Sequence, residues 1–130
     1  MRISEEQYRQ FLNKKPLKYH NNKVEYKGIK FDSIKEKNRY LYLKVLEEEG
    51  KISELELQKK FLLQEEFIDN TGKKQRPIYY IADFYYYDEK LKCDIAEDVK
   101  SEATRKDKVY QLKKKMFVHE YPWIAFKEVV

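Results

Sequence analysis

Two acidic motifs, fifteen residues apart, are the part of this sequence best suited to chemistry. Asp83 interrupts the aromatic and aliphatic run Ile78–Tyr87, and the second motif is Glu97-Asp98-Val99-Lys100. A carboxylate in an apolar strand is costly unless it is paired or binds a metal ion. Carboxylates are ligands that Mg²⁺ prefers, and a nearby lysine can orient water or stabilise developing charge. These residue types predict a divalent-cation site suited to phosphodiester hydrolysis.

Strand parity separates the two acids of the second motif. Residues two apart on a strand share a face, so Asp98 and Lys100 point to the same side of the sheet and Glu97 points to the other. The acid-x-lysine pairing therefore favours Asp98 as the ligand. The alternative for these acids is an ordinary salt bridge to a lysine on an exposed strand.

The register of the expected hairpin decides which acid meets Asp83. A turn centred on Glu89-Lys90 sets Asp83 opposite Ala96, with Asp98 one diagonal neighbour away on the same face. A shift of one residue brings Glu97 to that face instead. Glu97 is therefore the reserve ligand.

A third acid is expected from the helix that follows Asp32. Ser33-Ile-Lys-Glu36 is a capping-box pattern, and the helix is expected to run to about Glu49 and end at Gly50. Glu36 lies four residues before Tyr40 and so shares a helix face with residues that pack on the sheet. The interpretation favoured here is a metal ligand. The alternative is that Glu36 merely completes the capping box with Ser33.

A basic helix is predicted from Thr104 to about Tyr121, ended by Pro122. Its cations could hold phosphates beside the acidic cluster, while its apolar residues form another face. The alternative is a solvated face on a packed helix. The cations proposed to bind DNA are Arg105, Lys106, Lys108, Lys113 and Lys114, the expected apolar face holds Val109, Leu112, Met116 and Phe117, and Lys14, Lys15, Lys18 and Lys23 could extend the positive surface.

The elements that must position these residues follow from hydrophobic periodicity and turn signals. A helical segment is expected within residues 1–18, and the core of a single domain within 19–130. Asn70-Thr-Gly72 predicts a turn. The expected strands are Val24–Tyr26, Ile29–Phe31, Ile52–Gln58, Phe61–Ile68, the central strand Ile78–Tyr87, Leu91–Lys100 and Trp123–Val129. This order predicts one α/β domain with a central sheet flanked by helices.

Composition limits the class of protein. A chain of 130 residues with 42% hydrophobic and 15% aromatic residues can build a core without staples. The net charge of +5 points weakly to a polyanionic partner. One cysteine, Cys93, excludes an intramolecular disulfide and a thiolate zinc site, and it fits a reducing cytoplasm. No apolar run approaches membrane-spanning length, so a cytoplasmic protein without a membrane partner is expected.

Four segments together carry a resemblance to a known family. They are Ile29–Glu36, Leu55–Gln58, Tyr80–Phe84 and Glu97–Lys100. In this order and spacing they resemble a family of small phage proteins of the PD-(D/E)xK nuclease superfamily, over roughly residues 19 to 128. Two departures stand out: Ala82 replaces the proline that usually precedes the first aspartate, and Asp98 stands where glutamate is more usual.

The resemblance implies a mixed sheet flanked by helices, with Mg²⁺ (or Mn²⁺ as a substitute) at the acidic cluster. It implies that Glu36, Asp83 and Asp98 hold metal, that Lys100 positions water, and that Gln58 lines the pocket.

In function, the resemblance implies a phage or prophage endonuclease for branched or recombination-intermediate DNA, with the four-way Holliday junction as one candidate. Cutting a junction needs two symmetric sites, so a homodimer is expected, with phage or host recombination or replication proteins as further partners. The alternative is a catalytically inactive module with the nuclease fold that binds DNA or a protein.

Overall fold

The computed structural model describes residues 23–130, so the helical segment expected within residues 1–18, with its lysines, lies outside the described residues. The described chain opens with a small antiparallel hairpin of β1 (Val24–Tyr26) and β2 (Ile29–Phe31), as predicted. The turn residue Gly28 has φ of 82°, a conformation that glycine adopts without steric cost.

Helix α2 (Ile34–Glu48) follows at the predicted boundaries. The Ser33 hydroxyl accepts a hydrogen bond from the Glu36 backbone N–H, which makes Ser33 the N-cap. The Glu36 carboxylate accepts from the backbone N–H of Asp32, one residue before the cap, so the capping box is only half formed. Leu43 anchors the helix to the sheet because its side chain is fully buried.

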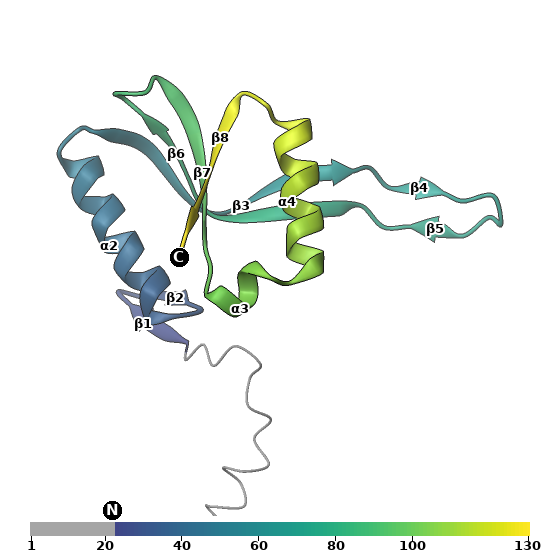
Figure 1. Ribbon diagram of the computed structural model, residues 1–130, viewed down its shortest axis with the longest axis horizontal. Coiled ribbons are helices and arrows are strands. Elements are labelled where there is room, and N and C mark those ends of the chain that lie inside the picture. The colour runs from purple at the N-terminus through teal and green to yellow at the C-terminus, as the bar shows by residue number, and fades with distance from the viewer. Residues whose placement is uncertain (1–22) are drawn as a thin grey trace, which may run out of the picture.

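The central sheet has four strands in the order β3 (Ile52–Gln64), β6 (Ile78–Asp88), β7 (Cys93–Val99) and β8 (Ile124–Val129). The β3–β6 and β6–β7 pairs are antiparallel, and β7–β8 is parallel. Helices α2 and α4 (Lys108–Glu120) lie on opposite sides of this sheet (Figure 1). The molecule is therefore an α/β protein with a central mixed sheet flanked by helices, as predicted. No helix among residues 23–130 is long and apolar enough to span a bilayer.

The prediction of separate strands Ile52–Gln58 and Phe61–Ile68 is wrong. The chain forms one continuous strand, β3, which pairs with β6 along most of its length. Gln58, where the first of the two strands was expected to end, has a left-handed φ of 51° inside the continuous strand.

Beyond β3 the chain forms a narrow arm. It consists of β4 (Phe67–Ile68) and β5 (Lys74–Gln75), joined by the predicted turn, in which Gly72 has φ of 86°. The arm extends β3 and β6 away from the rest of the molecule (Figure 1).

The single helix predicted from Thr104 is also divided. A four-residue helix, α3 (Glu102–Arg105), precedes α4, and Asp107 caps α4 by accepting hydrogen bonds from the N–H groups of Val109 and Tyr110. An aspartate at this position satisfies the free N–H groups of a new helix, which favours a break over continuation.

The predicted hairpin register is wrong by two residues. Phe84 pairs with Glu97, and continuation of this register sets Asp83 opposite Asp98 instead of Ala96. The turn is longer than expected because Asp88 accepts from two turn N–H groups and Lys92 adopts φ of 57°. A shift of two keeps every side chain on its expected face, so Asp98 still shares the face of Asp83.

Two hydrophobic clusters form the core, one against each helix. The first contains Phe117 of α4 with Tyr80 and Ala82 of β6, and the second contains Leu43 of α2 with Phe84 and Tyr86 of β6. These β6 residues share one parity, yet they serve different clusters.

The change of cluster occurs at Asp83, and the pairs Leu57–Phe84 and Lys59–Ala82 on either side set Gln58 opposite it. The left-handed residue and the acid therefore sit where the twisted sheet passes from one core to the other.

Candidate functional site

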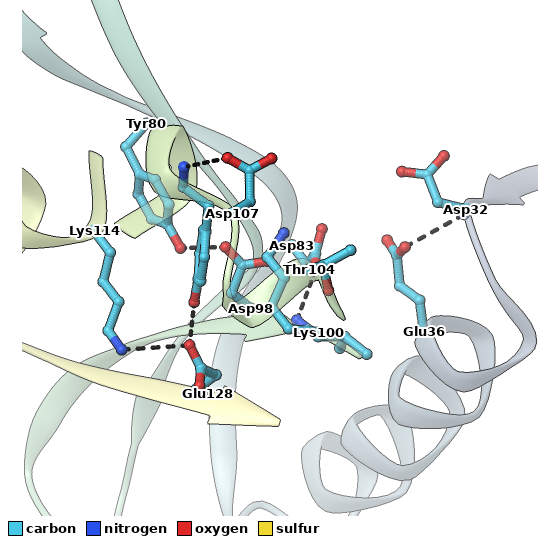
Figure 2. A network of polar contacts seen from close by, with 12 residues as sticks. Asp32, Glu36, Tyr80, Asp83, Asp98, Lys100, Thr104, Asp107, Lys114 and Glu128 are labelled. Atoms are coloured by element: carbon cyan, nitrogen blue, oxygen red, sulfur yellow. Dashed lines mark hydrogen bonds and ion pairs between the residues drawn. The ribbon is translucent and has the colours of Figure 1, made fainter. Parts of the chain in front are cut away.

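The structure brings Asp83, Asp98 and Lys100 together (Figure 2). Asp83 lies in the middle of β6, Asp98 lies near the end of β7, and Lys100 directly follows β7. The side chain of Asp98 is 2% exposed, and its Oδ1 lies 3.1 Å from the Lys100 Nζ. Tyr80 donates its hydroxyl to Asp98 Oδ2. Asp83 Oδ2 accepts from the backbone N–H of Val99 at 2.8 Å.

The electrostatics of the pair are unfavourable without a cation. Burial and the charge of Asp98 raise the pKa of Asp83 to about 8. Among residues 23–130, Asp98 Oδ1 is buried and accepts no hydrogen bond, and its one ion-pair partner is the ammonium of Lys100. Burial also raises the pKa of the Tyr80 phenol, which therefore remains a donor at neutral pH.

Lys100 is held from two sides. One is the carboxylate of Asp98, and the other is the ring of Tyr110 on α4, with Nζ 4.6 Å from the ring centroid. Tyr110 in turn donates its hydroxyl to Glu128 of β8, which lies directly beside Asp98 in the parallel pair. The sequence patterns missed Tyr80, Tyr110 and Glu128, because only the sheet and α4 bring them to the acids.

Glu36 faces the same site from α2, and its side chain is buried. The amide of Gln58 donates to Glu36 Oε1 at 3.1 Å and to Asp83 Oδ1 at 3.3 Å, so it bridges the two acids. Burial, and then the charge of Asp32, raise the pKa of Glu36. Glu36 therefore reaches the pair through an amide, not by direct contact, and Figure 2 shows it apart from Asp83 and Asp98.

A polar pocket of about 130 Å³ opens between these groups. Gln58 does not line it, although the resemblance implied that it would. The lining residues are acids, lysines and hydroxyl side chains with one valine, namely Asp32, Ser33, Lys35, Glu36, Asp83, Val99, Lys100, Ser101 and Thr104. Such a pocket suits a small, charged, strongly hydrated group.

Glu97, the reserve ligand, lies on the other face of β7, away from Asp83. Its carboxylate is fully buried and is held by Arg39 of α2 through two hydrogen bonds of 2.7 and 2.8 Å, and by the hydroxyl of Tyr86. This bidentate pair joins α2 to β7. Both oxygens of Glu97 therefore have a partner in Arg39, and Glu97 does not line the pocket.

The five cations proposed to bind DNA divide into two groups. Arg105 and Lys114 both pair with Glu128, at 2.7 and 3.3 Å. Lys106, Lys108 and Lys113 have no ion-pair partner among residues 23–130, and Lys106 and Lys108 are exposed at the junction of α3 and α4.

The expected apolar face of α4 is partly wrong. Phe117 is buried and Met116 is half-buried, but Val109 and Leu112 are 62% and 60% exposed. Tyr110, which was not expected on that face, packs against the sheet together with Met116 and Phe117.

The donor set fits a hard divalent cation. Two neighbouring carboxylates, one with a raised pKa and one with an oxygen lacking any hydrogen bond, supply oxygen ligands of the kind that Mg²⁺ takes. Among residues 23–130, no three His, Cys, Asp or Glu side chains form a ready-made metal-binding group. The fit therefore rests on two acids, with water and substrate oxygens needed for the remaining positions.

Comparison with known proteins gives a family but no activity. Neither the curated proteins nor the solved structures gave a match to this chain. The model of one family, described as "Protein of unknown function (DUF1064)", matches residues 16–130. The chain belongs to the DUF1064 family.

Proposed function

We propose that this protein is a Mg²⁺-dependent DNA endonuclease that hydrolyses phosphodiester bonds. The observation that carries the proposal is the grouping of Asp83, Asp98 and Lys100, in which Asp83 and Lys100 line a polar pocket and Asp98 is buried behind it. Two acids placed close together, at an electrostatic cost, are characteristic of a site built for a cation.

In this proposal Asp83 and Asp98 hold the metal, Mg²⁺ or Mn²⁺, and Glu36 contributes through Gln58. Glu97 is left out, because Arg39 already satisfies it. A divalent cation bound there would polarise the phosphate and make hydroxide available near neutral pH.

The chain's own groups have separate tasks. Lys100, fixed by Asp98 and Tyr110, is placed to orient the attacking water and to stabilise charge on the phosphate. Gln58 keeps the carboxylates of Glu36 and Asp83 in fixed orientation. Lys106 and Lys108 are exposed beside the site and could hold neighbouring DNA phosphates.

The substrate class follows from the resemblance to the PD-(D/E)xK superfamily. On that basis we propose branched or recombination-intermediate DNA, including the four-way junction, and an origin in a phage or prophage. The central mixed sheet and the order of the acidic motifs support this assignment. Symmetric cutting of a junction would require a homodimer.

The test is a cleavage assay on linear, nicked, flapped and four-way DNA, with Mg²⁺ and with EDTA. We expect Mg²⁺-dependent cutting of the branched substrates. Asp83→Asn should abolish cleavage and leave DNA binding intact, whereas the control Asp94→Asn, on β7 but outside the pocket, should remain active. Undiminished cutting by Asp83→Asn would refute the site.

A second candidate is a binding module with the nuclease fold but without catalysis. It would rest on the exposed cations Lys106 and Lys108, which could hold phosphates without a metal ion. Calorimetric titration with Mg²⁺ separates the two. Heat of binding that Asp83→Asn abolishes supports the nuclease, and no heat together with tight DNA binding supports the module.

A further inference from the structure

An apolar groove of about 500 Å³ lies away from the acidic pocket, between β6 and α4. Its apolar lining is Ile78, Tyr79 and Ile81 of β6 with Val109, Leu112 and Met116 of α4. Four of these residues are exposed, and the proposed chemistry uses none of them. Exposed apolar residues grouped in this way indicate an interaction surface.

The arm is the second unpartnered feature. Phe67 and Ile68 of β4 are 45% and 71% exposed, and the arm contributes no residue to either core cluster. A two-stranded hairpin alone is marginally stable in water, so an arm of this kind gains stability from a surface to pack on.

The arm does not lie on the groove of its own chain. It continues β3 and β6 outward, away from α4 (Figure 1). The groove begins at the base of the arm, with Lys60, Pro77 and Ile78 among its lining residues. A second copy placed antiparallel can therefore bring its arm to this groove while its own groove receives the first arm.

We propose that this protein forms a homodimer in which the arm of each copy seats Phe67 and Ile68 in the groove of the other. The two contacts are identical, as a two-fold axis requires. This dimer surface lies apart from the acidic pocket, so dimer formation does not depend on catalysis.

The arm carries one acid that could pair with lysines of the groove. Glu65 precedes the apolar pair on the arm and has no ion-pair partner among residues 23–130, since Lys74 pairs with Glu66. Lys60 and Lys113 line the groove, and the ammonium of Lys60 lies over the ring of Tyr79. An acid at the base of the incoming arm would therefore meet lysines at the groove.

The first experiment is sedimentation equilibrium of the full chain, without DNA. We expect a monomer–dimer equilibrium whose dissociation constant rises at least about tenfold in Ile68→Asp and in Leu112→Asp. The exposed Leu91→Asp, far from both surfaces on the turn before β7, is the control and should dimerise as the wild type does. A wild-type chain that remains monomeric overturns the proposal.

A charge exchange tests the pairing independently of folding. Glu65→Lys and Lys60→Glu should each weaken the dimer, and the double variant should recover most of the loss. Circular dichroism spectra confirm that each variant is folded. Additive losses in the double variant would contradict this pairing.

Cross-linking tests which surfaces meet. On a Cys93→Ala background, a mixture of the Ile68→Cys and Leu112→Cys chains should form a mixed disulfide between copies on oxidation. A disulfide that forms only between two Ile68→Cys chains would show that the arms contact each other. That result would overturn the proposed contact between arm and groove. The dimer result and the cleavage result are separate, because a dimer that does not cut DNA refutes only the nuclease.

Discussion

At the scale of single residues, Asp83 explains most of what the site can do. It stands opposite Asp98, accepts hydrogen bonds from Val99 and Gln58, and has a pKa raised to about 8 by burial and by Asp98. Ionisation of this carboxyl in the folded protein costs free energy, and a bound cation would remove that cost.

The first prediction concerns pH. Because the unfolded pKa of an aspartate is about 3.9 and the folded one is about 8, the folded state binds more protons between these values, and stability falls as pH rises through that window. Glu36, Asp98 and Lys100 face this group and broaden the transition. Urea unfolding from pH 5 to 8 should therefore show Asp83→Asn gaining stability over the wild type as pH rises. A constant difference across this range would contradict the raised pKa.

The second prediction concerns the left-handed residue Gln58. A β-branched residue is strained at its φ of 51°, whereas glycine is not, so Gln58→Val should be about 1–2 kcal/mol less stable than Gln58→Gly. Both variants lose the bridge to Glu36 and Asp83 and should bind Mg²⁺ more weakly. Urea unfolding and Mg²⁺ calorimetry measure these effects. Equal stability of the two variants would show that the strain is absent.

At the scale of elements, the buried Arg39–Glu97 pair determines how α2 meets β7. Glu36 lies one turn before Arg39, and Val99 and Lys100 follow Glu97 closely. All three line the pocket, so this pair fixes the separation of its two walls. The pair thus links helix packing to the geometry of the acids.

The third prediction tests that link. Removal of one partner leaves a buried charge, so Arg39→Met or Glu97→Met should cost on the order of 3 kcal/mol of unfolding free energy, and the double variant should lose less than the sum. The exposed pair Lys51–Glu49 is the matched control, and Glu49→Gln should change the unfolding free energy little. Losses that simply add in the double variant would show that the two side chains act separately.

At the scale of the whole molecule, the site lies where the two core clusters meet. β6 serves the α4 cluster before Asp83 and the α2 cluster after it, so elements of both clusters build the site. Binding at such a junction should stabilise the entire fold.

The fourth prediction follows from mass action. A cation that binds only the folded state at 100 times its dissociation constant adds about 2.7 kcal/mol, so millimolar Mg²⁺ should raise Tm by several degrees. EDTA should reverse the shift, and Asp83→Asn should show little of it. A Tm that does not respond to Mg²⁺ would contradict a cation site at this pair.

Three features could be predicted from the sequence: helix α2 with its Ser33 cap, the strands around Asp83 and Asp98, and the face that these acids share. These follow from local rules, since capping, periodicity and strand parity depend on near neighbours alone. The expected β6–β7 register was wrong by two residues, but a shift of two leaves each side chain on the same face of the sheet. The shared face of Asp83 and Asp98 was therefore predicted correctly.

The other features of the site depend on contacts between distant parts of the chain. Arg39 of α2 holds both carboxylate oxygens of Glu97, a contact between residues 58 positions apart in the sequence. The fold likewise places Gln58 between Glu36 and Asp83, where its amide bridges the two acids. The exposure of Val109 and Leu112 likewise depends on which side of α4 packs against the sheet. The physical reason is that partners distant in sequence, burial and charge together fix these features, and no local pattern contains them.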